Sequence, residues 1–182
     1  MKLQMCGLGL AIVLAVVPGA FAQNDSSLDA GRKIRDGGMA HGAQYHQRHA
    51  QNQSQILYYY SQSQHPIPKA EAKELIAGIK GSLTAADKSL AKLKADHAKE
   101  PEVQKLITSI EKHQAKAHEV CGMAEEHCLK EHGDHVIIGD CCSEMWHEID
   151  AAHDDTAKLM KLLKIDNLAK PKKVTAKSDG KK

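Results

Sequence analysis

Residues 103–160 read VQKLITSIEKHQAKAHEVCGMAEEHCLKEHGDHVIIGDCCSEMWHEIDAAHDDTAKLM. Apolar residues recur in steps of three and four in the first part, and residue types that bind metals continue the same stripe. The apolar part is Val103, Leu106, Ile107, Ile110, Gln114 and Ala117, and the continuation is His118, Cys121, Glu125, Cys128, His132 and His135. A helix turns once per about 3.6 residues, so both sets share one face. The stretch predicts a core helix whose inner face changes from aliphatic side chains to potential metal ligands.

A last helix follows a glycine-bearing link over residues 133–139, and Asp140 is its predicted N-cap. Its predicted inner side is Cys141, Cys142, Met145, Ile149, Ala152, Thr156, Leu159 and Leu163. Because the link is short, the two helices should form an antiparallel hairpin. This hairpin would bring Cys128 beside Cys141 or Cys142.

Two further helices are predicted earlier in the chain. The clearer one spans residues 69–99, with Ile76, Ile79, Leu83, Ala86, Leu90, Leu93 and His97 on its inner face. The other begins near Met39 and carries His41, Tyr45, His49, Asn52 and Ile56 on the face predicted to point inward. Four amphipathic segments with short links predict an all-α fold, an up-down-up-down four-helix bundle over residues 39–168.

The ends of the chain have a different character. Residues 1–22 resemble an export signal, with Lys2, an apolar run over residues 8–17 and the cleavage pattern Ala20-Phe21-Ala22. Residues 23–38 contain three glycines and predict a flexible arm, and the lysine-rich residues 169–182 predict a disordered tail. The mature protein is therefore expected to start at Gln23 and to be periplasmic or secreted.

Charge and hydropathy exclude some classes of partner. The formal net charge is only +2, which indicates no electrostatic preference for nucleic acid. After residue 22 no stretch approaches the roughly 20 apolar residues of a membrane-spanning helix, so membrane insertion is not expected.

The candidate ligands divide into two clusters, because residues seven apart rise about 10 Å along a helix and cannot bind the same ion. The inner cluster is His118, Cys121 and Glu125, completed by His49 or His153 from neighbouring helices. The outer cluster is Cys128, His132 and His135 with Cys141, Cys142 and Met145. Imidazole, thiolate and thioether ligands suit copper(I) or zinc, and we place copper first.

Two other interpretations compete with metal binding. Cys6 lies in the export signal, and the remaining four of the five cysteines could form disulfides in an exported protein. Glu144 and His147 have the Glu-x-x-His spacing of di-iron bundles, but the pair occurs once. The chain has no G-x-S-x-G, phosphate-binding glycine loop or H-E-x-x-H motif, so we predict no enzymatic activity.

A helical bundle with Cys, His and Met on its inner face between residues 118 and 145 resembles the exported four-helix copper-storage proteins. Those proteins carry repeated Cys-x-x-x-Cys steps, and this chain has none, so the residues present support one or two ions per chain. The sequence therefore predicts an exported protein that binds copper or zinc for sequestration, delivery or sensing. The alternative is a structural or interaction module, in one version a homodimer, whose helices are stapled by disulfides.

Overall fold

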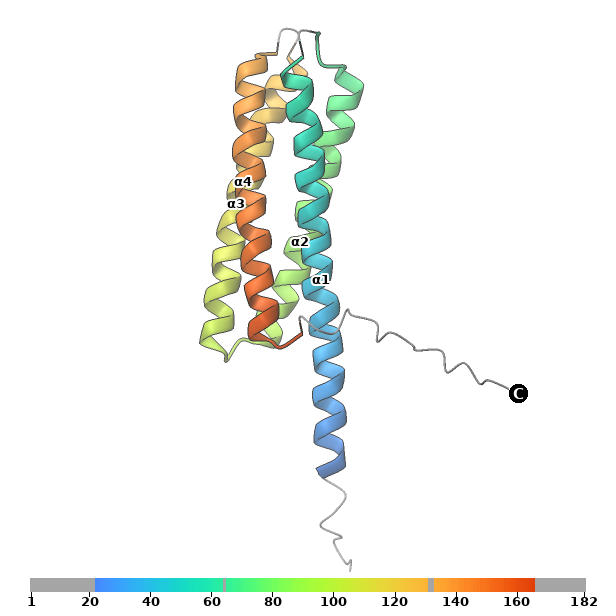
Figure 1. Ribbon diagram of the computed structural model, residues 1–182, viewed down its shortest axis with the longest axis vertical. Helices are drawn as coiled ribbons and strands as arrows, with labels where there is room; N and C mark the ends of the chain where they lie inside the picture. The colour runs from blue at the N-terminus through green and yellow to red at the C-terminus, as the bar shows by residue number, and fades with distance from the viewer. Residues whose placement is uncertain (1–21, 64, 131–132, 166–182) are drawn as a thin grey trace, which may run out of the picture.

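The computed structural model describes residues 22–63, 65–130 and 133–165, and these residues form four helices. The helices are α1 (Ala22–Ser61), α2 (Lys69–Asp96), α3 (Pro101–Leu129) and α4 (His135–Leu162). They lie side by side as a bundle, with α1 between α2 and α4 and with α3 opposite it (Figure 1). The predicted all-α four-helix bundle is confirmed. The predicted export signal and lysine-rich tail fall outside the described residues, apart from Ala22.

α1 is longer than predicted. It begins at Ala22 rather than near Met39, so residues 23–38, predicted as a flexible arm, are helical. A glycine inside a helix costs only about 1 kcal/mol relative to alanine, and no proline interrupts this segment. An ion pair between Asp29 and Lys33, 2.8 Å long and one turn apart, supports the helix. The first turns of α1 project beyond the end of the bundle (Figure 1).

The inner face of α1 also differs from the prediction. The buried residues are mostly small or amide-bearing: Ala40, Ala43, Gln47, Ala50, Gln51, Ser54 and Leu57. In contrast, Tyr45 and Ile56 have 67% and 45% of their surface exposed, and His49 is also exposed. Small side chains allow α1 to pack closely against its neighbours, and the bulky polar aromatics point outward.

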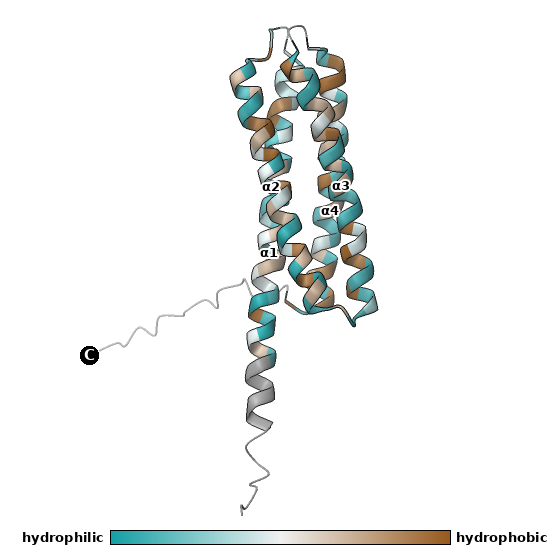
Figure 2. Ribbon diagram, turned by 180° about the vertical axis from the view of Figure 1, so that it is seen from behind, coloured by the Kyte–Doolittle hydropathy of each residue, from teal (hydrophilic) through white to brown (hydrophobic). Residues whose placement is uncertain are grey.

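The inner faces of α2, α3 and α4 follow the apolar pattern. Every residue predicted for the inner face of α2 is buried. The residues predicted for the inner face of α4 are also buried, except Leu163, which is partly buried. Hydrophobic and hydrophilic residues alternate along these helices, as amphipathic helices require (Figure 2). Pro101 lies in the first turn of α3, where its missing N–H is harmless.

α4 begins earlier than predicted, and Asp134, not Asp140, is its N-cap. The Asp134 carboxylate accepts hydrogen bonds from the backbone N–H groups of Val136 and Ile137, at 2.9 and 3.2 Å. Gly139 therefore lies inside the helix rather than in a link. A Cβ at Gly139 would lie 3.0 Å from Ser61 Oγ, so the glycine allows the end of α1 to approach α4.

The core consists of two apolar clusters, one toward each end of the bundle. Buried amide side chains lie at the boundary between the two clusters on α1 and α3. On α1 this residue is Gln47, and its Nε2 donates a hydrogen bond of 3.1 Å to Thr156 Oγ1 on α4. Gln114 is the corresponding residue on α3, and it is 1% exposed. The four cysteines of the described chain all belong to the cluster nearer the α3–α4 link.

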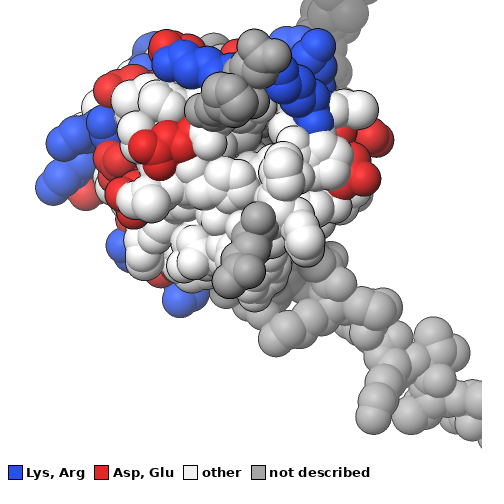
Figure 3. Space-filling model, turned by 90° about the horizontal axis from the view of Figure 1, so that it is seen from above, with Lys and Arg blue, Asp and Glu red and all other residues white. Residues whose placement is uncertain are grey.

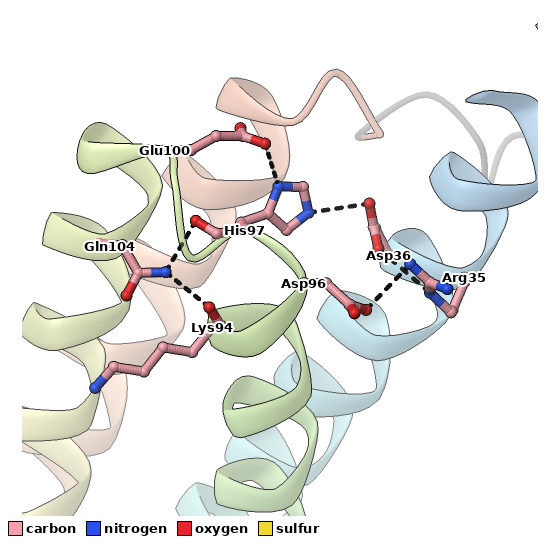
Figure 4. A network of polar contacts seen from close by, with 7 residues as sticks. All are labelled: Arg35, Asp36, Lys94, Asp96, His97, Glu100 and Gln104. Carbon is pink, nitrogen blue, oxygen red and sulfur yellow. Dashed lines mark hydrogen bonds and ion pairs between the residues drawn. The ribbon is translucent and has the colours of Figure 1, made fainter. Parts of the chain in front are cut away.

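A buried histidine ties the opposite end of the bundle together (Figure 4). His97 follows α2, and its Nε2 lies 3.1 Å from Asp36 Oδ2 on α1, while its Nδ1 lies 2.8 Å from Glu100 Oε1. An ion pair joins α1 and α2 at the same place, because Arg35 Nη2 lies 3.1 Å from Asp96 Oδ2. Asp36 and His97 are nearly inaccessible to solvent, so α1 is anchored to α2 at the point where it leaves the bundle.

Candidate metal centre

Four cysteine thiols meet in the core near the α3–α4 link. Cys121 and Cys128 come from α3, and Cys141 and Cys142 come from α4. Their residues are between 0 and 6% exposed, and none of the four forms a disulfide. We call these four residues the thiol cluster.

The antiparallel packing of α3 and α4 produces this grouping. Cys128 lies in the last turn of α3, and Cys141 and Cys142 lie near the start of α4, so the two helices bring them to the same end. The thiols are close enough to influence one another electrostatically. Burial raises the pKa of Cys128, and the charge that Cys141 or Cys121 would carry as a thiolate raises it further.

Burial keeps these thiols protonated. Burial raises the pKa of Cys121 and of Cys128 to about 11, and it also raises the pKa of Cys141 and of Cys142. Lys80 partly offsets the effect of burial on the pKa of Cys121. Thiols of this kind are poor nucleophiles at neutral pH, because the thiolate is the reactive form. A metal ion would have to displace their protons to bind.

Met145 adds a fifth sulfur to the same apolar cluster. It lies one turn beyond Cys141 on α4 and is 0% exposed. The surrounding residues of the cluster are aliphatic, among them Val120, Ala124 and Ile149. The environment of these sulfur atoms is therefore hydrocarbon rather than water.

The other predicted ligands of α3 and the α4 N-terminus face elsewhere. His118 Nε2 lies 2.9 Å from Asp87 Oδ2 on α2, and Glu125 forms an ion pair with Lys80, also on α2. His135 Nδ1 lies 3.1 Å from the backbone oxygen of Ser61. His132 falls outside the described residues. The inner face of α3 instead runs through Ala117, Val120, Cys121, Ala124 and Cys128, so His118 and Glu125 flank it.

The two additional histidines are likewise separate from the thiol cluster. His49 is exposed, its ring stacks on that of Tyr45, and its Nδ1 lies 2.9 Å from Ser82 Oγ. His153 is partly buried on α4, and burial and the charge of Arg48 lower its pKa. On α4 His153 follows Cys142 by 11 residues, which is about 16 Å along the helix axis.

Across residues 22–63, 65–130 and 133–165, no group of three or more His, Cys, Asp and Glu side chains is arranged to hold a metal ion. The thiols are gathered in one region without already surrounding a common point. Glu144 of the Glu-x-x-His pair is exposed and lies 3.5 Å from Lys116, and His147 is exposed as well.

A groove between α1 and α4 reaches the thiol cluster from the side, and the sequence analysis did not identify it. Its volume is about 220 Å³, and its lining residues are Gln55, Tyr58, Cys142, Ser143, Trp146 and His147. Trp146 follows Cys142 by one helical turn, and this spacing is a sequence signal that could have indicated the α4 wall of the groove. We call this groove the α1–α4 groove.

At the end of the bundle above the thiol cluster, the described charged residues lie away from the centre. Seen from above, the described lysine, arginine, aspartate and glutamate residues lie mostly toward the edges of this end (Figure 3). Exposed apolar residues begin α4, with Val136 71% and Ile137 38% exposed.

Comparison with known proteins gives no relative: no protein-family description, curated protein or solved structure matches this chain. None of the helices in the described part of the chain combines the length and the apolar character needed to cross a membrane.

Proposed function

We propose that this protein binds a soft transition-metal ion, copper before zinc, at the thiol cluster, for sequestration, delivery or sensing. The observation that carries the proposal is the convergence of four unpaired thiols and the Met145 thioether in one apolar core region. Thiolate and thioether sulfur are soft ligands that favour copper(I). The imidazoles of His118 and His135, which would favour zinc, have other hydrogen-bonding partners.

The charge of the bound state also favours copper(I). A copper(I) ion held by two thiolates carries one net negative charge. Zinc is almost always four-coordinate in structural sites, and zinc held by all four cysteines as thiolates would carry two. Transferring charge from water into an apolar interior is unfavourable, and the cost rises with the charge. Lys80 acts on the pKa of Cys121 in the direction that favours a thiolate, and its ion-pair partner Glu125 acts in the opposite direction.

Copper(I) titration against a competing chelator, under anaerobic reducing conditions, tests the proposal. The matched variants are Cys128→Ser/Cys142→Ser, which removes one thiol from each helix, and His118→Ala, which removes an imidazole that faces Asp87. We expect the double variant to lose most of the affinity and His118→Ala to retain it. A double variant that binds as tightly as the parent would overturn the proposed site.

Thiol titration of the unfolded protein separates metal binding from the structural alternative. Protein purified without oxygen should show every cysteine as a free thiol if the thiol cluster binds metal. Disulfides between α3 and α4 would instead leave few or no free thiols, and the parent would then bind no copper(I) without reduction. That result would favour a stapled structural module.

We also propose that the protein works outside the cytosol after removal of residues 1–22. Support comes from the sequence: Lys2, the apolar run over residues 8–17 and Ala20-Phe21-Ala22 form the pattern of an export signal. The mass of the intact native protein tests this. A chain that starts at Gln23 is expected, and a native chain that retains Met1 would contradict the proposal.

A further inference from the structure

An ion that binds the thiol cluster has to cross the protein surface, because the four cysteines are at most 6% exposed. Cys142 lines the α1–α4 groove. Cys142 itself is 0% exposed although it lines the groove, so the groove ends directly against this residue.

The chemistry of the groove suits a weakly hydrated cation. Tyr58 from α1 and Trp146 from α4 supply aromatic surface, and aromatic rings attract cations at their faces. None of the six lining residues is Lys, Arg, Asp or Glu, so nothing in the wall would repel a cation or hold it by charge alone.

His147 supplies a nitrogen ligand at the same groove. It is exposed, and its ring lies edge-on to Trp146 with 5.2 Å between the ring centroids. Within the described part of the chain no hydrogen bond engages the His147 imidazole, so a ring nitrogen is available. Neutral imidazole binds copper(I) less strongly than thiolate does, which is the order required of an outer ligand that passes an ion inward.

We infer that the α1–α4 groove is the access route by which a copper(I) ion reaches the thiol cluster, with His147 as its first ligand and Cys142 as the first thiol. This inference rests on the proposed function. In the transfer the copper–nitrogen bond to His147 breaks, and a copper–sulfur bond to Cys142 forms. The Cys142 proton passes to the vacated imidazole or to water, and the oxidation state of copper does not change.

The test measures how fast copper(I), supplied as its acetonitrile complex, loads the reduced full chain, together with its equilibrium affinity. Ser143→Trp places a bulky side chain at the edge of the groove. We expect loading to slow by about tenfold, equivalent to about 1.4 kcal/mol of barrier, with the affinity unchanged. His147→Ala should also slow loading and leave the affinity unchanged, because the final ligands are sulfur atoms.

Ala115→Trp is the matched control. Ala115 is exposed and lines a different groove, between α3 and α4, so the same new side chain there should leave the loading rate unchanged. If Ser143→Trp does not fold, Gln55→Trp obstructs the groove from α1 instead. Folding of each variant is checked by circular dichroism.

The outcomes distinguish the two proposals. A parent that binds copper(I) and a folded Ser143→Trp variant that loads as fast as the parent would overturn the access route while leaving the thiol cluster as the binding site. Equal slowing by Ser143→Trp and Ala115→Trp would overturn it too. A parent that binds no copper(I) would overturn the proposed function, and the access route with it.

Discussion

Gln114 shows what a single buried amide does to this core. It lies on the inner face of α3 and is 1% exposed, and neither of its amide atoms has a hydrogen-bond partner in the described part of the chain. Leaving a buried polar group unsatisfied costs about 1–3 kcal/mol. We therefore expect Gln114→Leu to raise the free energy of unfolding by about that amount. Urea denaturation measures the change.

Gln104 provides the control on the same helix. Its Nε2 donates hydrogen bonds to the backbone oxygens of Lys94 and His97, at 2.8 and 3.0 Å. Gln104→Leu removes both bonds and should lower the free energy of unfolding. If the two leucine variants change the free energy of unfolding in the same direction, the presence or absence of hydrogen-bond partners does not determine the effect of the substitution.

His97, at the end of the bundle opposite the thiol cluster, is a second buried polar residue whose contacts should affect stability. Both of its ring nitrogens face carboxylate oxygens, and the Asp36 carboxylate is buried beside it. Without His97 the buried Asp36 carboxylate keeps, among the described residues, only the Arg35 guanidinium, 3.9 Å away, as a charge partner, so His97→Ala should cost about 3 kcal/mol. His113 forms a more exposed pair with Glu148, and His113→Ala should cost about 1 kcal/mol or less. Similar losses in the two variants would contradict this ranking.

At the scale of the element, the α4 N-terminus depends on Asp134. Its carboxylate satisfies two backbone N–H groups that the helix leaves without partners. Asp134→Ala should lower the free energy of unfolding by about 1 kcal/mol, whereas Asp134→Ser should restore most of the loss. Asp140 is an exposed residue inside α4, so Asp140→Ala should have little effect on thermal or urea denaturation. A larger loss from Asp140→Ala would favour the later helix start.

The helices differ in how far their inner faces could be predicted from the sequence. Large aliphatic residues line α2, and their spacing gave the correct face. The inner face of α1 is built from residues such as Ala43, Gln47 and Ser54, which give no hydropathy signal. Tyr45 and His49 were the conspicuous residues, and they point outward. Close packing of small side chains is a tertiary effect that periodicity does not detect.

The candidate site was partly predictable for a related reason. Cysteine behaves as a small apolar residue, so the stripes that located the core also located the thiol cluster. His118 and Glu125 lie at the edge of the α3 stripe, and their orientation depends on Asp87 and Lys80 of α2. A pattern within one helix cannot identify partners on another helix. The α1–α4 groove was missed because it requires knowing that α1 and α4 are neighbours.

At the scale of the whole molecule, the bundle should not need the projecting part of α1. None of the side chains at residues 29–35 is buried, and among the side chains that the structure describes Asp36 is the first buried one. A chain that starts at residue 34 should therefore unfold at the same urea concentration as a chain that starts at Gln23. A chain that starts at residue 38 loses the Asp36 partner of His97 and should be less stable. Equal stability of all three chains would mean that the contact between Asp36 and His97 contributes little.

The thiol cluster should also make the stability of the whole apo protein sensitive to alkaline pH. The pKa of Cys121 is about 9.0 when unburied and about 11 in the folded protein. Between these values the unfolded chain has lost a proton that the folded chain keeps, so the free energy of unfolding falls as pH rises from about 9 to about 11. The loss from one such thiol is on the order of 2 kcal/mol.

Urea denaturation of reduced protein at pH 8 and at higher pH measures this loss, and Cys121→Ala should make it smaller. Tyr60 is a control, because its hydrogen bond to Glu71 raises its pKa at the surface, and Tyr60→Phe should leave most of the loss in place.

Bound copper(I) should reverse the dependence of stability on pH, since a loaded site holds thiolates and protons compete with the ion. Loaded protein should therefore lose its copper-dependent stability as pH falls. A loaded protein whose stability follows that of the apo protein at every pH would mean that copper does not bind through these thiols.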